Sequence, residues 1–211
     1  MSNKVKGLIG LGVGALVLIL VLTLGGKSTE DKILDMEKDV YSLFDKSYTD
    51  VKEASTKNDL KDVYKEIIGN ILELTPELLS LSQDYIDENY NGDFTEYMKP
   101  ENQEAEMKKY ESLYGKWTTL FFKFTALSSD DSWLEKMESI AETFDEKDIA
   151  ELINFSFDEG ASAVEKIAND EKSLKYFNKM AKEFSKQMMG EDYYQKDFTK
   201  EELLSAIKDA K

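Results

Sequence analysis

Residues 110–127, YESLYGKWTTLFFKFTAL, carry the clearest helical pattern in the chain. Apolar and aromatic side chains recur here at alternating steps of three and four residues: Tyr110, Leu113, Trp117, Leu120, Phe124 and Leu127. Such steps place side chains on one face of an α-helix, and Tyr114 and Phe121 widen that face. The pattern predicts a helix over about residues 101–127 whose aromatic face lies in a protein core.

The same spacing continues on both sides of this stretch. Before it, the pattern predicts a helix over 30–56, a second from Asn58 or Asp59, and a third from Thr75-Pro76 to Asn91-Gly92. After it, helices are expected from Trp133 to Phe144, over 149–157, over 161–168 beyond a break at Gly160, over 171–189 up to Gly190, and from a capping box at Thr199–Glu202. Both prolines, Pro76 and Pro100, are expected at helix starts. The sequence therefore predicts an all-α fold, a multi-helix bundle of about seven to eight helices.

The N-terminal region differs from the rest because residues 7–26 contain no charge. Twenty such residues match the length that a helix needs to cross a bilayer, which predicts a single transmembrane signal anchor. Lys4 and Lys6 precede it, and basic residues are retained in the cytoplasm. We therefore expect residues 1–6 inside and residues 27–211, an acidic α-helical domain, outside the cytoplasmic membrane. A signal peptide cleaved near Thr23-Leu24-Gly25 is the alternative.

Glycines mark one face of the predicted anchor. Gly7, Gly10 and Gly14 lie on the same side of a helix, where small residues let two membrane helices approach closely and self-associate. Lys6-Gly7 ahead of the apolar run resembles the leader junction of type IV pilins over the first two dozen residues. That resemblance implies a pilin-like assembly, although Gly12 stands where the pilin pattern has glutamate.

Composition excludes several kinds of chemistry. The chain has 43 acidic residues against 27 basic ones, a net charge of −16, and lacks histidine and cysteine; every basic residue is lysine. An acidic chain is unsuited to nucleic acid, because phosphates need a basic surface. Imidazole bases, thiolate nucleophiles, Cys/His metal sites and disulfides are absent. A lipoprotein is excluded too, since its lipid needs a thiol, and lysine in place of arginine indicates a low-GC bacterium.

One segment has the spacing of a metal site. Residues 87–98, DENYNGDFTEYM, resemble the first half of an EF-hand calcium loop, with Asp87, Asn89, Asn91 and Asp93 as candidate ligands. Met98 stands where the loop has its bidentate glutamate. The favoured interpretation is an ordinary helix end with a left-handed cap at Asn91-Gly92, and a weak calcium site is the alternative.

These patterns predict a membrane-anchored, non-enzymatic binding or scaffold protein without a cofactor. Its expected partners are the lipid bilayer and either another protein or a second copy of the chain. Two alternatives stay open: a subunit of a membrane or surface assembly of the secretion or pilin type, and an envelope hydrolase built on Asp and Glu side chains.

Overall fold

The computed structural model describes residues 29–109, 111–189 and 196–210, and these residues form nine helices and no strand. The predicted all-α helical bundle is confirmed, with one or two helices more than expected. The helices are α2 (Thr29–Glu53), α3 (Lys57–Tyr90), α4 (Phe94–Tyr97), α5 (Pro100–Lys109), α6 (Glu111–Leu127), α7 (Asp131–Glu142), α8 (Glu146–Asn169), α9 (Glu171–Met189) and α10 (Lys200–Ala210).

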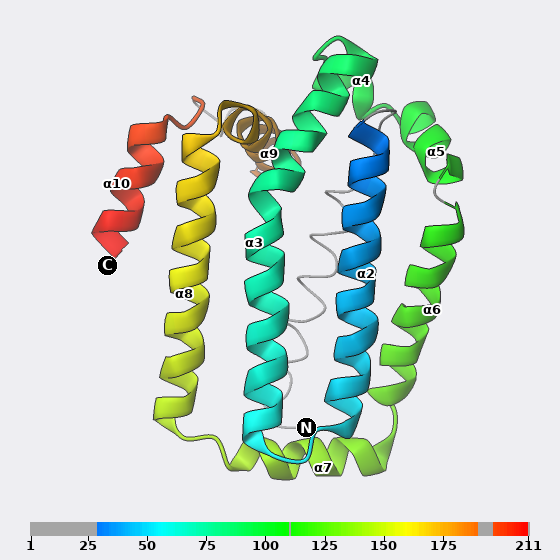
Figure 1. Cartoon of the computed structure of the whole chain (residues 1–211), viewed down its shortest axis with the longest axis vertical. Helices are drawn as coiled ribbons and strands as arrows, with labels where there is room; N and C mark the ends of the chain where they lie inside the picture. Colours follow the sequence, from blue (N-terminus) through cyan, green and yellow to red (C-terminus); the bar gives the residue numbers. More distant parts are fainter. Residues whose placement is uncertain (1–28, 110, 190–195, 211) are drawn as a thin grey trace.

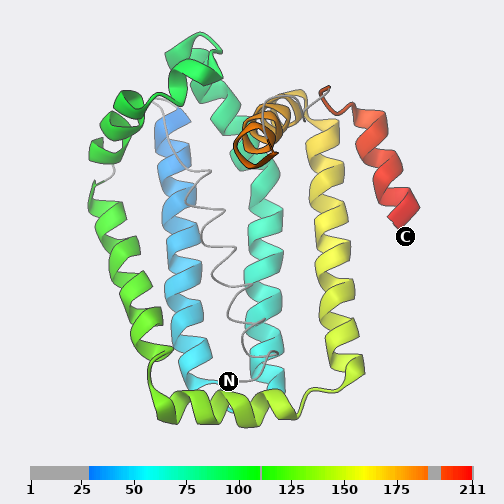
Figure 2. The ribbon, with the colours of Figure 1, turned by 180° about the vertical axis from the view of Figure 1, so that it is seen from behind.

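Four long helices lie side by side in the order α6, α2, α3, α8 (Figures 1 and 2). The short α7 crosses one end of this layer, and α9 packs on α3 near the other end. Helix α10 lies along α8, so α6 and α10 are the outermost helices of the described chain. Helix α2 begins at the end of the layer that carries α4 and α9 (Figure 1).

The core between α2 and α6 is aromatic, as residues 110–127 predict. Phe44, Leu120 and Trp117 are buried, and the ring of Trp117 makes edge contacts with Tyr41 and Phe44 at 5.5 and 5.7 Å between centroids. Edge-to-face packing is the favoured arrangement for such rings. Two further apolar clusters join α7 to the layer and α9 to α3. Helices α7 and α9, at the two ends of the layer, are therefore each held by a separate cluster of buried residues.

Helix α3 is continuous where the sequence predicts two helices. It begins after Thr56, whose side chain and that of Asp59 form a capping box, and it runs through Pro76 to Tyr90. A proline inside a helix leaves a carbonyl without its usual donor and costs about 3 kcal/mol. Helix α9 nevertheless packs on this site: Pro76 is buried, and the Ser173 hydroxyl donates to the Pro76 carbonyl at 2.6 Å.

Helix α8 is also unbroken, so the predicted break at Gly160 is wrong. A capping box of Asp145 and Asp148 starts the helix, and it continues to Asn169. The predicted helix over 101–127 corresponds to α5 and α6, and residue 110 between them lies outside the described residues. Pro100 starts α5 as expected, and Thr199 and Glu202 form the predicted capping box of α10.

Gly160→Ala is expected to raise the free energy of unfolding by about 0.5–1 kcal/mol, because alanine favours a helix interior and no atom lies within 4 Å of the added Cβ. Gly92→Ala is the matched contrast. Gly92 has a φ of +76°, and its added Cβ would lie 2.9 Å from Asp87 Oδ1, so this variant should be destabilised. Chemical denaturation of both variants measures the two signs, and stabilisation of Gly92→Ala would contradict the account of this turn.

The predicted anchor, with Gly7, Gly10 and Gly14, lies outside the described residues. Among the helices that are described, none is long and apolar enough to span a bilayer. The transmembrane helix therefore stays a prediction from the sequence. The chain would leave such a helix at Gly26, only three residues before α2 begins at Thr29.

Candidate functional site

The four candidate calcium ligands lie at the end of α3 and just beyond it. Asn89 donates to the Tyr85 carbonyl at 3.1 Å, and Asn91 is the left-handed C-cap of α3 with a φ of 50°. Asp93 is the N-cap of α4, where its Oδ1 accepts the backbone N–H groups of residues 95 and 96 at 2.9 and 3.0 Å. The segment thus ends one helix with Asn91-Gly92 and starts the next with Asp93.

Asp87 is paired with nitrogen donors. Its Oδ1 accepts from Gln83 at 2.7 Å and from Lys175 of α9 at 3.2 Å. Burial alone would raise the pKa of the Asp87 carboxyl, but the hydrogen bonds from Gln83 and Lys175 outweigh it and hold the pKa below its ordinary value. The carboxylate therefore joins α3 to α9.

A second lysine of α9 points to the same turn. Lys179 donates to the Gly92 carbonyl at 3.0 Å, and burial followed by repulsion from Lys175 lowers its pKa. A calcium ion at Asp87 would have to displace Lys175 and lie near Lys179. In the described part of the chain, no group of three or more Asp and Glu side chains is placed to hold a metal.

We expect no calcium binding tighter than about 10 μM, because sensor-type affinity needs the full ligand set that Met98 interrupts. Titration calorimetry of the protein, with Asp87→Ala as control, measures this. Tight binding that disappears in the variant would instead identify residues 87–98 as a metal site.

A network of ion pairs joins α3 to α8. Asp148 accepts from Lys57 at 2.6 Å and from Lys61 at 3.0 Å, and Glu151 pairs with Lys61 and Lys65. Hydrogen bonds from Lys57 and from the backbone N–H of Asp145 hold the pKa of the Asp148 carboxyl well below its ordinary value. Both carboxylates are engaged by lysines, so the network fixes the contact between the two helices.

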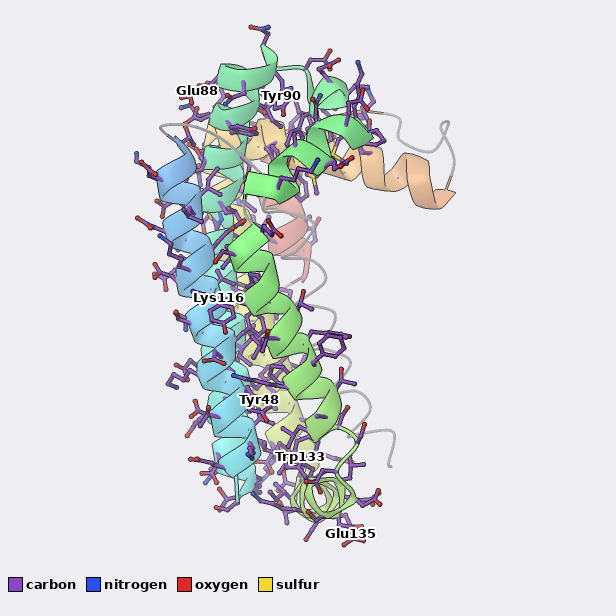
Figure 3. All side chains as sticks on the ribbon, turned by 90° about the vertical axis from the view of Figure 1, so that its right-hand side faces the viewer. Tyr48, Glu88, Tyr90, Lys116, Trp133 and Glu135 are labelled. Atoms are coloured by element: carbon purple, nitrogen blue, oxygen red, sulfur yellow. The ribbon has the colours of Figure 1, made fainter. Side chains whose placement is uncertain are left out.

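Helix α6 has an apolar inner face and an uncharged outer face. Its inner face, with Trp117 and Leu120, packs on α2. Its two lysines also turn toward α2: Lys116 lies over the Tyr41 ring at 5.9 Å, and Lys123 pairs with Asp45 at 2.8 Å. Figure 3 shows Lys116 between the two helices. The lysines of α6 are therefore used within the chain.

The outer face of α6 carries no charge along residues 115–129. Phe122, 63% exposed, lies at its centre, and Phe121, 58% exposed, lies beside it. No other described helix covers this face, which forms the edge of the layer turned toward the viewer in Figure 3. We call it the α6 outer face; it consists of Gly115, Thr118, Thr119, Phe121, Phe122, Thr125 and Ala126 of α6 and of Ser128 and Ser129 in the turn that follows, all exposed.

Four of the five hydroxyl groups of this face donate to carbonyl groups of α6. Thr119 donates to the Gly115 carbonyl and Thr125 to the Phe121 carbonyl, both at 2.9 Å, and Ser128 and Ser129 donate to the Thr125 carbonyl at 2.9 Å. A polar group that keeps its hydrogen bond costs little to bury. The α6 outer face is therefore suited to burial against a partner.

Sequence reasoning missed this face. The pattern placed Phe121 on the buried face, whereas its ring is exposed; the side chain of Tyr114 lies outside what the structure describes. The available signal was charge: α6 has only Glu111, Lys116 and Lys123 in 17 residues, although a third of the chain is charged. A surface helix with so few charges indicates a contact.

The chain matches no protein family, no curated protein and no solved structure.

Proposed function

We propose that this protein is a non-enzymatic binding or scaffold protein, tethered to the cytoplasmic membrane by residues 7–26, with its acidic helical domain outside. The proposal rests on one observation above all, the uncharged α6 outer face in a chain of net charge −16. Uncovered apolar surface rimmed by polar residues marks interaction sites on proteins. The acidic remainder keeps the domain soluble and repels other acidic surfaces.

The carboxylates that the structure brings near lysines support binding over turnover. A carboxyl group acting as a general acid needs a raised pKa, as in glycoside hydrolysis. Asp87, Asp148 and Glu151 have the opposite shift. At Asp87 burial is the largest single effect and would raise the pKa, but hydrogen bonds from Gln83 and Lys175 outweigh it. Hydrogen bonds, chiefly from lysines, lower the pKa of the Asp148 and Glu151 carboxyls below their ordinary values. These groups serve as fixed anions that hold helices together.

A second candidate function is a subunit of a membrane or surface assembly. The exposed rings of Phe121 and Phe122 favour it, because a repeated contact through an edge helix would cover them. This candidate differs from the first only in the number of protein contacts that each chain makes. Both functions need the helical domain on the outer side of the membrane.

Protease treatment of intact spheroplasts is expected to digest residues 27–211 and to leave the anchor protected, because Lys4 and Lys6 keep the N-terminus inside. Antibodies against the C-terminus and against a tag at residue 1 report the two ends. A cytoplasmic protein in the same sample controls for lysis. Protection of the whole chain would contradict the proposed orientation.

The enzyme alternative has its own test. The purified protein is incubated with cell-wall glycan and peptide substrates, and products are followed by mass spectrometry. We expect no turnover, whereas hydrolysis lost on substitution of one Asp or Glu would replace the binding function by the hydrolase.

A further inference from the structure

Helix α10 lies on part of α8 and leaves the rest of that helix open. Figures 1 and 2 show it beside the half of α8 that ends at Asn169. At about 1.5 Å per residue, the 11 residues of α10 span about 16 Å and the 24 residues of α8 span about 36 Å. The half of α8 that begins at Glu146 therefore extends beyond α10.

The chain enters α10 through a fixed point on α9. The Asn178 side chain, 7% exposed, accepts the backbone N–H of Phe198 at 2.8 Å and donates to the Phe198 carbonyl at 3.0 Å. The rings of Phe177 and Phe198 also contact each other, with 6.0 Å between their centroids. A buried amide that keeps both of its hydrogen bonds is costly to separate from its partner. We call this contact the Asn178 clasp.

Beyond the clasp, α10 is held weakly. Among residues 200–209 no side chain is buried, and Leu203, Leu204 and Ile207 are half-buried. A helix of this length is marginal in water unless it packs on a neighbour. Charge does not favour the contact, because α8 has six acidic residues and two lysines, and α10 has three acidic residues and two lysines. Helix α10 is therefore fixed at one end and easily opened along the rest of its length.

The apolar face of α8 continues past the end of α10. Ile153, Phe157, Gly160 and Val164 follow one another at steps of four, three and four residues, which places them on one face of the helix. We call them the α8 stripe. Val164, in the half beside α10, is half-buried, whereas Phe157 is 38% and Ile153 is 62% exposed. At its open end the stripe meets a hollow of about 420 Å³, which is lined by Asp145, Glu146, Ile149, Ala150 and Ile153.

We propose that α10 is a displaceable strap, hinged at the Asn178 clasp, and that the α8 stripe binds a basic amphipathic helix of a partner protein in its place. An amphipathic helix, α10, already lies along α8, so a helix is the shape that fits there. A helix with lysine or arginine beside its apolar face would be attracted where α10 is repelled, and Asp145 and Glu146 at the hollow outnumber Lys147. The inference goes beyond the proposed function, since it needs neither the membrane tether nor the α6 outer face.

Hydrogen exchange of the full-length protein in non-ionic detergent tests the strap. We expect the amides of residues 200–210 to exchange at least about 100-fold faster than those of α8, because opening α10 exposes little buried surface. Asn178→Ala should raise their exchange at least about fivefold further, because Phe198 loses both hydrogen bonds. Asn169→Ala is the matched control, since its side chain donates to the Glu165 carbonyl of its own helix. Exchange as slow in α10 as in α8, or equal in the two variants, would overturn the strap.

The preference of the α8 stripe for a basic helix is tested within the chain. Glu201→Lys combined with Asp209→Lys makes α10 basic, and because the two changes lie at opposite ends of the helix, their effects on the helix dipole cancel. We expect this strap to close more tightly and the exchange of residues 200–210 to slow at least about threefold. Lys200→Glu combined with Lys208→Glu should speed it instead. Equal exchange in the two charge variants would overturn the basic partner.

Displacement is measured with spin labels, because the chain has no cysteine of its own. Labels at Ser162→Cys on α8 and Ser205→Cys on α10, both exposed, report the distance between the two helices by pulsed electron resonance. The probe is a synthetic peptide of residues 199–211 with the two lysine substitutions, in molar excess over protein and micelles. We expect this distance to lengthen by at least about 10 Å in part of the population, while labels at Ser162→Cys and Thr49→Cys keep theirs. An unchanged distance between residues 162 and 205 at saturating peptide would overturn the proposal.

Discussion

Phe44→Ala is expected to lower the free energy of unfolding by about 3–5 kcal/mol, a large part of the stability of a domain this size. Phe44 is 1% exposed, and its ring packs against Trp117 in the cluster that holds α6 to α2. Alanine would leave a cavity that the two long helices cannot close. Chemical denaturation of the full-length protein in detergent, followed by circular dichroism, measures the loss.

Ser42→Ala is the control for this substitution. Ser42 is exposed on the same helix, so its change should stay within about 0.5 kcal/mol. A small effect of Phe44→Ala, equal to that of the control, would mean that α6 is not held by this core.

Tyr176→Phe should make stability less sensitive to alkaline pH. Burial raises the pKa of Tyr176 to about 12, against the opposing hydrogen bond with Ser82. The phenol in the unfolded chain ionises near its ordinary pKa of 10.0, so the folded state binds the proton more tightly and loses stability as pH rises from 10 to 12. Two pKa units correspond to a loss of about 3 kcal/mol, which the variant should not show.

At neutral pH the same variant should cost about 1–3 kcal/mol, because the buried Ser82 loses its phenol partner. Ser82→Ala is the matched control: it removes the same hydrogen bond but keeps the phenol and hence the alkaline loss. Denaturation curves at pH 7, 10 and 12 compare the three proteins. A parallel decline of wild type and Tyr176→Phe would contradict the buried position of this ring.

Periodicity predicts much of this fold because most helices bury one regular face. Leu113, Trp117 and Leu120 are buried as their spacing requires. The same spacing misplaced Phe121, which lies at the edge of that face, because a pattern of apolar residues does not distinguish a core from a contact surface. The small number of charged residues in α6 indicates that its exposed side is a contact surface.

Two errors have a tertiary cause. Pro76 and Gly160 are local helix breakers, but both lie inside long helices that pack against neighbours, and the Ser173 hydroxyl bonded to the Pro76 carbonyl comes from α9. The sequence of residues 87–98 likewise does not show what surrounds the candidate calcium ligands, because Lys175, which pairs with Asp87, also belongs to α9. Local sequence carries no sign of such contacts.

The central claim is that this protein acts by contact through the α6 outer face, and photo-cross-linking in living cells tests it most directly. A photoreactive phenylalanine derivative is placed at Thr118 of the full-length chain and, as a control, at Thr49 on α2, both exposed. We predict protein cross-links from residue 118, to a second copy or to another protein, at least about fivefold above those from residue 49. Equal or absent cross-linking from residue 118 would contradict the claim.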